Sequence, residues 1–147
     1  MHFAEDFFYN FNKKMEARDL LILELRGESI GMVSNQSSPE ESFQNKTLRP
    51  ILKLQNDLFI EVFRNYAIKQ KNVFFTLSPD KKNAYIENVI QRDIKFRNSL
   101  KGIVIAFFTI EEYREYIKNS SNLNKRMMNM LIERLKSQIL LFENVEI

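Results

Sequence analysis

The stretch QRDIKFRNSLKG, residues 91–102, places apolar side chains at helical spacing and sets two charged residues among them. In a projection at about 100° per residue from Ile90, Asp93 falls at roughly −60° and Arg97 at roughly −20°. Both lie inside an apolar face centred near roughly −50°, and as an i, i+4 pair they can reach one another. The pattern therefore predicts a helix that turns an aspartate and an arginine toward the interior.

Residues that form turns are scarce, with three glycines and three prolines among 147 residues. A β protein of this size needs many more turns, so long helices are expected. Helix starts are indicated at Ser38-Pro39-Glu40-Glu41, Ser78-Pro79-Asp80, the capping box Thr109-Ile110-Glu111-Glu112 and Asn119 to Ser121. Gly27 is expected to end the first helix, and Arg49-Pro50 to interrupt the helix that begins at Pro39. A longer helix is expected from Pro50 to about Lys71, and the helix that begins at Pro79 is expected to reach about Leu100 or beyond. These signals predict an all-α, single-domain antiparallel bundle of five or six helices.

The length fits one domain, predicted to span residues 1–147. Residues 28–38 are rich in Gly, Ser, Asn and Gln, which predicts a loop. The chain has no cysteine and one histidine, His2, which excludes disulfides, thiolate nucleophiles and multi-His metal sites. The longest apolar run, at 103–110, is far shorter than the roughly 20 residues of a membrane span. With no signal-peptide pattern, the sequence predicts a cytoplasmic protein without metal or cofactor.

Polar residues on two other predicted helices also project inward, at Gln55 and at Asn124, Arg134 and Gln138. Leaving such a group unpaired in a core costs roughly 1–3 kcal/mol, so each is expected to find a hydrogen-bond partner. Asp93 and Arg97 then have two interpretations. They form a buried ion bridge that fixes helix register, or the arginine binds a carboxylate or phosphate ligand while the aspartate orients it. The candidate buried polar cluster or ligand site comprises Asp93, Arg97, Gln55, Asn124, Arg134 and Gln138.

Charge is unevenly distributed along the chain. Residues 1–41 hold 4 basic and 8 acidic side chains (net −4), residues 42–101 hold 12 and 5 (net +7), and residues 102–147 hold 6 and 6. The basic middle segment is compatible with a nucleic-acid or ribosomal partner, but a solvated lysine-rich face is the favoured interpretation. The candidate polyanion-binding residues are Lys46, Arg49, Lys53, Lys69, Lys71, Lys81, Lys82, Lys95 and Lys101.

No catalytic triad, metal cluster, P-loop or Gly-rich phosphate cradle is present, so no catalytic residue is predicted. Glu111, Glu112 and Glu115 are explained by capping and the helix dipole, and Met127–Leu131 by burial in the core. The leading hypothesis is a non-catalytic interaction or regulatory module with a protein partner or self-association. Binding of RNA, DNA or the ribosome is the alternative, and a small-ligand or enzymatic site inside the bundle is the second alternative.

Three segments, residues 43–66, 91–105 and 119–139, resemble a set of short bacterial all-helical proteins of unknown function, some of which are labelled glyoxalase. The resemblance covers about residues 15–142, so residues 1–14 are interpreted as an N-terminal extension. The glyoxalase label implies a metal-dependent lyase built from βαβββ units with His, Gln and Glu ligands. This sequence predicts helices and has one histidine, so no catalytic residue is carried over from the resemblance.

Overall fold

The computed structural model describes residues 17–27, 31 and 37–142. In this part of the chain, seven α-helices follow the helical residues 17–26, and no strand occurs. The helices are α2 (Pro39–Phe43), α3 (Arg49–Leu54), α4 (Asn56–Lys69), α5 (Pro79–Arg92), α6 (Ile94–Ile105), α7 (Ile110–Tyr116) and α8 (Ser120–Ser137). The prediction of an all-α single domain is confirmed, and the predicted number of five or six helices is too low. Residues 1–14 and most of the predicted loop at 28–38 lie outside the described residues.

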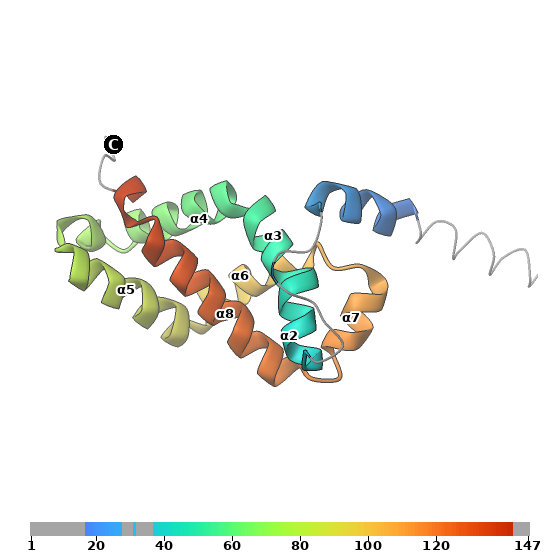
Figure 1. Cartoon of the computed structure of the whole chain (residues 1–147). Coiled ribbons are helices and arrows are strands. Elements are labelled where there is room, and N and C mark those ends of the chain that lie inside the picture. The colour runs from blue at the N-terminus through green and yellow to red at the C-terminus, as the bar shows by residue number, and fades with distance from the viewer. Residues whose placement is uncertain (1–16, 28–30, 32–36, 143–147) are drawn as a thin grey trace, which may run out of the picture.

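Three shorter helical turns connect these elements: a π-helix η1 (Gln44–Leu48) and two 3-10 helices, η2 (Val73–Thr76) and η3 (Ile139–Phe142). Among the helices whose bounds are described, α8 is the longest, and it crosses the molecule next to α5, which runs in the opposite direction (Figure 1). α5 and α6 also contact each other, and α6 and η1 both contact α8. α8 is therefore the element that α5, α6 and η1 share as a neighbour.

Several predicted helix ends are confirmed at the level of the backbone. The Ser38 hydroxyl accepts a hydrogen bond from the Glu41 amide at 3.1 Å, with Pro39 in the first turn. Thr109 and Glu112 form the predicted capping box, each side chain bonding the other residue's amide. Gly27 adopts a φ of 73°, the left-handed geometry typical of a residue that ends a helix.

The predicted interruption at Pro50 takes the form of a change in helical winding. Arg49 keeps right-handed helical dihedrals, and its amide bonds the carbonyl of Gln44, five residues earlier. Proline has no amide hydrogen and its ring crowds the carbonyl four residues before it, which is that of Lys46. A π-turn directly before Pro50 therefore carries the chain past the proline without ending the helical path.

The helix predicted from Pro79 to about Leu100 is broken at Asp93. This residue has an extended backbone (φ −81°, ψ 96°) and caps α6, its carboxylate accepting from the Phe96 amide at 3.1 Å. The Tyr66 hydroxyl donates to the same carboxylate at 2.7 Å, and the Tyr66 ring stacks on Phe96 at 4.0 Å. The aspartate sits on the apolar side of the pattern because it begins a helix there. An Asp side chain favours this position over a helix interior.

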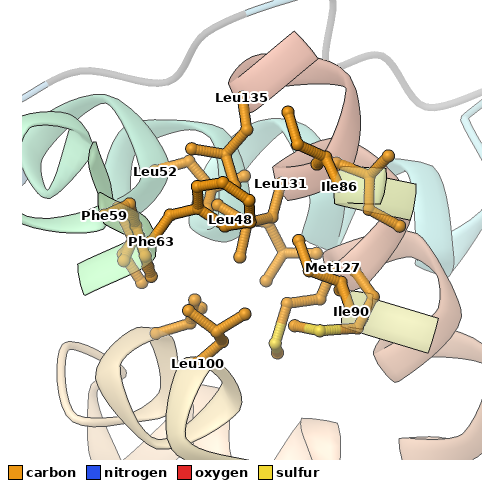
Figure 2. Packing of buried hydrophobic residues seen from close by; sticks show 14 of the residues in the cluster. Leu48, Leu52, Phe59, Phe63, Ile86, Ile90, Leu100, Met127, Leu131 and Leu135 are labelled. Carbon is orange, nitrogen blue, oxygen red and sulfur yellow. The ribbon is translucent and has the colours of Figure 1, made fainter. Parts of the chain in front are cut away.

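The core is built by large apolar side chains from η1, α3, α4, α5, α6 and α8, which converge in Figure 2. Phe63 lies at the centre of an aromatic group, with the rings of Phe74 and Phe142 at 5.1 and 5.3 Å from its own. Met127 and Leu131 are fully buried, as predicted for the methionine-rich run. None of the described helices is long and apolar enough to cross a membrane.

The cap at Asp93 is testable by substitution. We expect Asp93→Ala to lower the midpoint of thermal unfolding by on the order of 3 °C, because α6 loses its cap and Tyr66 its acceptor. Asp93→Asn retains an oxygen for the Phe96 amide, so its shift is smaller. Arg97→Ala is the control, with a shift below about 1 °C. Equal shifts for Asp93→Ala and Arg97→Ala in a calorimetric scan would contradict the capping role.

Candidate functional site

Helix 17–26 lies at the edge of the molecule, near α7 (Figure 1), and Arg26 attaches it to the body. The Arg26 guanidinium donates to both carboxylate oxygens of Glu112, at 2.5 and 2.8 Å. It also donates to the backbone carbonyls of Lys46 and Phe107, at 2.9 and 3.3 Å. The side chain of Arg26 is only 2% exposed, so this is a buried ion pair in a dense network of acceptors.

The same side of helix 17–26 makes further polar contacts with the segment before α7. Arg18 donates to the carbonyls of Phe108 and Ala106, at 3.0 and 3.2 Å. Asp19 accepts long hydrogen bonds of 3.4 Å from the amide of Ile110. Ile22 is the one buried apolar side chain of the helix among the residues described. Helix 17–26 is therefore held to the body mainly by charged and polar groups.

Glu112 is the centre of this attachment. Burial raises the pKa of its carboxyl, but hydrogen bonds from Arg26, Thr47 and the Thr109 amide outweigh burial and bring the pKa below its ordinary value. The Thr47 hydroxyl donates to the carboxylate at 2.5 Å. The capping role predicted for Glu112 is confirmed, while its ion pair with Arg26, 86 residues away, went unpredicted. Arg26 follows Ile22 by four residues, so the projection used for the other helices would have placed it on the inner face.

The outward side of helix 17–26 carries four leucines around one acidic residue, Glu24. Its four leucines are exposed at 65% (Leu20), 62% (Leu21), 45% (Leu23) and 61% (Leu25). In an ordinary surface helix the apolar stripe faces the core and the polar side faces solvent. Helix 17–26 has the reverse orientation among the described residues.

The predicted ion bridge between Asp93 and Arg97 does not form, so this prediction is wrong. The break at Asp93 rotates the following helix away from the continuous projection, and Asp93 bonds Tyr66 and Phe96 instead. Arg97 is half-buried and donates to the carbonyl of Gln91 at 3.2 Å. The hydrogen bond from Tyr66 and then that from Phe96 lower the pKa of Asp93, whereas burial and Asp93 raise the pKa of Tyr66.

Arg97 and Asn124, two members of the predicted cluster, do lie together. They line a cavity of about 330 Å³ between the end of α5, α6 and α8, with Gln91, Lys101, Ser121, Lys125, Met128 and Asn129. Asn124 accepts a hydrogen bond from the Tyr116 hydroxyl at 2.6 Å. We call this cavity the α6–α8 pocket.

Arg134 and Gln138 lie at a second location, where α8 meets α4. Gln138 and Asn56 exchange two amide hydrogen bonds of 2.7 Å, and Arg134 donates to Asn56 at 3.3 Å. Burial and then the charge of Arg49 lower the pKa of Arg134. Gln55, predicted to point inward, is half-buried at the junction between α3 and α4. The helix predicted from Pro50 to about Lys71 changes phase at this junction, so Asn56 is the residue that meets α8.

The nine candidate polyanion-binding residues are spread over several elements. Lys46, on η1, and Arg49 and Lys53, on α3, are exposed, as are Lys69 and Lys71 at the end of α4, Lys81 on α5 and Lys95 on α6, while Lys101 is half-buried. Lys82 is 6% exposed, and its ammonium lies 5.7 Å from the centre of the Phe74 ring. The burial of Lys82 argues against its predicted contact with a polyanion, because its charge lies against the aromatic core.

Comparisons of the chain with protein-family models, with curated proteins and with solved structures found no match. The described residues contain no group of three or more His, Cys, Asp or Glu placed to hold a metal ion. The resemblance to short bacterial proteins stays a prediction.

We expect the stability contributed by Glu112 to depend on pH. Its pKa in the folded chain lies below the unfolded value of about 4.3, so its contribution is complete above about pH 6 and is lost as pH falls through the folded pKa. The unfolding free energies of the parent and Glu112→Gln should therefore differ at pH 6 and converge toward pH 3 in urea titrations. A difference that stays constant over this range would show that the charge of Glu112 does not stabilise the fold.

The ion pair itself is tested at Arg26. Arg26→Ala leaves a buried carboxylate without its cation, and we expect a loss of about 3–5 kcal/mol in urea unfolding. The double variant Arg26→Met, Glu112→Leu should recover much of this loss, because neither charge is left buried. Arg18→Ala, at a side chain that is 44% exposed, is the matched control and should cost less than about 1 kcal/mol. A loss at Arg26 no larger than at Arg18 would contradict the anchoring role.

Proposed function

We propose that this protein is a non-catalytic interaction module that binds another protein through the leucines of helix 17–26. The observation that carries the proposal is the orientation of the helix, whose charged side contacts the body and whose leucines face outward. Fully burying a leucine is worth about 1.5–3 kcal/mol relative to leaving it exposed. The four leucines together thus supply a driving force for association that the described part of the chain leaves unused.

The positions of the leucines favour a groove as the surface that receives them. At about 100° per residue from Ile22, Leu21 and Leu25 lie on one flank of the helix, and Leu23 and Leu20 lie on the other. A flat surface contacts one flank, whereas a groove contacts both, as in the recognition of amphipathic helices by grooved proteins. The proposed partner is therefore a protein with an apolar groove.

Glu24 adds an electrostatic requirement. It is exposed, and it projects at roughly −160° from Ile22, between the two leucine flanks. A groove that receives the leucines also receives this carboxylate, so a basic residue at the floor or rim of the groove would match it. The partner is thus an apolar groove that carries a Lys or Arg.

The anchoring of helix 17–26 suits this role. Arg18, Asp19 and Arg26 fix the helix to the body through the segment before α7, so its leucines are presented in one orientation. Holding the binding surface in its bound form lowers the entropy cost of association. Binding of a partner protein requires only that the helix is held in one orientation, and it needs no catalytic group.

The test is site-specific photo-cross-linking with the full chain in its host cell. A photoreactive residue at Leu21 should give one defined adduct with another protein, and the added change Leu25→Lys should abolish that adduct. The same photoreactive residue at Leu140, 69% exposed on η3, is the control and should give no such adduct. Equal adducts at both positions would refute the proposal, and a product containing two copies of this chain would replace the partner with self-association.

A second measurement separates binding from folding. Leu21→Lys should change the free energy of unfolding by less than about 0.5 kcal/mol, since Leu21 is exposed. With the partner isolated from the adduct, the same variant should bind at least about 30-fold more weakly, as at a central interface residue. Loss of stability in parallel with binding would show that Leu21 supports the fold instead of the interface.

A further inference from the structure

The α6–α8 pocket carries three cationic side chains, Arg97 and Lys101 from α6 and Lys125 from α8. No carboxylate lines it, and its other polar groups are the side chains of Gln91, Ser121, Asn124 and Asn129. Its volume of about 330 Å³ falls in the range of sites for small ligands. The pocket shares no residue with the leucine surface of helix 17–26, so it is a separate site.

No described carboxylate forms an ion pair with any of the three cations, Arg97, Lys101 and Lys125. Three positive charges around one concavity repel each other, and together they favour the approach of an anion. The charge of the pocket therefore favours binding of an anion.

Hydrogen bonds within the fold leave donors available on Asn124 and Arg97. The hydrogen bond from Tyr116 occupies the side-chain oxygen of Asn124, which leaves the amide nitrogen of Asn124 as a donor. One guanidinium nitrogen of Arg97 is fixed on the carbonyl of Gln91. This contact orients the planar group, whose other N–H donors suit two oxygens of one tetrahedral anion. The chemistry of the lining therefore selects an acceptor-rich anion.

We propose that the α6–α8 pocket binds the phosphate group of a small molecule, with Arg97, Lys101 and Lys125 as its cationic ligands. A phosphate dianion supplies negative charge to three cations and acceptors to the amide and hydroxyl donors. Met128 contributes an apolar wall, and the volume leaves room for an organic group attached to the phosphate. The phosphates of a nucleic-acid backbone share this chemistry, so the test also includes a DNA that has no terminal phosphate.

Binding is measured by isothermal titration calorimetry and thermal shift with the full chain at constant ionic strength set with KCl. The probes are inorganic phosphate, a nucleoside 5′-monophosphate and a single-stranded DNA 12-mer without terminal phosphate. We expect saturable binding of the first two and a rise in the unfolding midpoint of at least about 2 °C at saturation. Lys101→Gln and Lys125→Gln should each weaken the binding about tenfold or more.

Lys95→Gln is the matched control, because Lys95 lies on α6 and is exposed but does not line the pocket. It should change the affinity less than about twofold, since exposed charges farther from the ligand are screened by salt.

Without phosphate, Lys125→Gln should be at least as stable as the parent, because it removes one of the repelling charges. This readout shows that the variant is folded.

Three outcomes would overturn the proposal. The first is the absence of saturable binding of phosphate and of the monophosphate. The second is an equal loss of affinity in Lys95→Gln and Lys125→Gln, which would show general electrostatic attraction without a pocket. The third is binding of the 12-mer alone, which would assign the cations to a nucleic-acid backbone. If Lys101→Gln fails to fold, the exposed Lys125 carries the test by itself.

Discussion

The contact between Arg26 and Glu112 joins three parts of the chain that are far apart in sequence. Glu112 caps α7 through Thr109, accepts from Thr47 on η1 and pairs with Arg26 at the end of helix 17–26. A single carboxylate thus sets the position of α7 relative to η1 and of helix 17–26 relative to both. Because the group is largely buried, each of its hydrogen bonds is stronger than the same bond in water.

Pro50 explains part of the environment of Arg26. A proline cannot donate to the carbonyl four residues before it, here that of Lys46, and the preceding turn widens to a π-helix. Arg26 supplies a donor to that carbonyl from helix 17–26, at 2.9 Å. The local defect that proline introduces in one helix thereby becomes an attachment point for another. The leucine surface keeps its orientation through this chain of local and long-range contacts.

The sequence predicts those helix ends that depend on only a few neighbouring residues. The starts of α2 and α7 and the end of helix 17–26 follow from Ser38, Thr109 and Gly27, since each satisfies or frees backbone groups next to it. The breaks at Asp93 and Gln55 were not readable in this way, because an apolar repeat continues across both and neither carries Gly or Pro. When a helical projection is continued across a break, it assigns every later side chain to the wrong face. This is why Arg97 was paired with the wrong residue and Asn56 was missed by one position.

The site predictions succeeded where helix faces decide a contact and failed where tertiary packing decides it. Grouping Arg97 with Asn124 needed only the inner faces of two helices, and the α6–α8 pocket contains both. The ion pair of Arg26 with Glu112 depends on how segments 86 residues apart meet, which no periodicity describes. A buried arginine paired with a carboxylate is the kind of contact that the sequence predicts. Tertiary packing forms it between Arg26 and Glu112, and not between Arg97 and Asp93.

Charge counted along the chain also differs from charge gathered in space. Residues 102–147 carry equal numbers of acidic and basic side chains, so the linear count assigns them no preference for anions. The fold brings Lys125 of α8 to the α6 cations, while Glu111, Glu112 and Glu115 lie on α7 and do not line the pocket. The basic middle segment contributes two cations to this pocket, and a neutral segment contributes the third. A concave site with three like charges can therefore draw one of them from a segment without net charge, because helix packing decides which charges face one another.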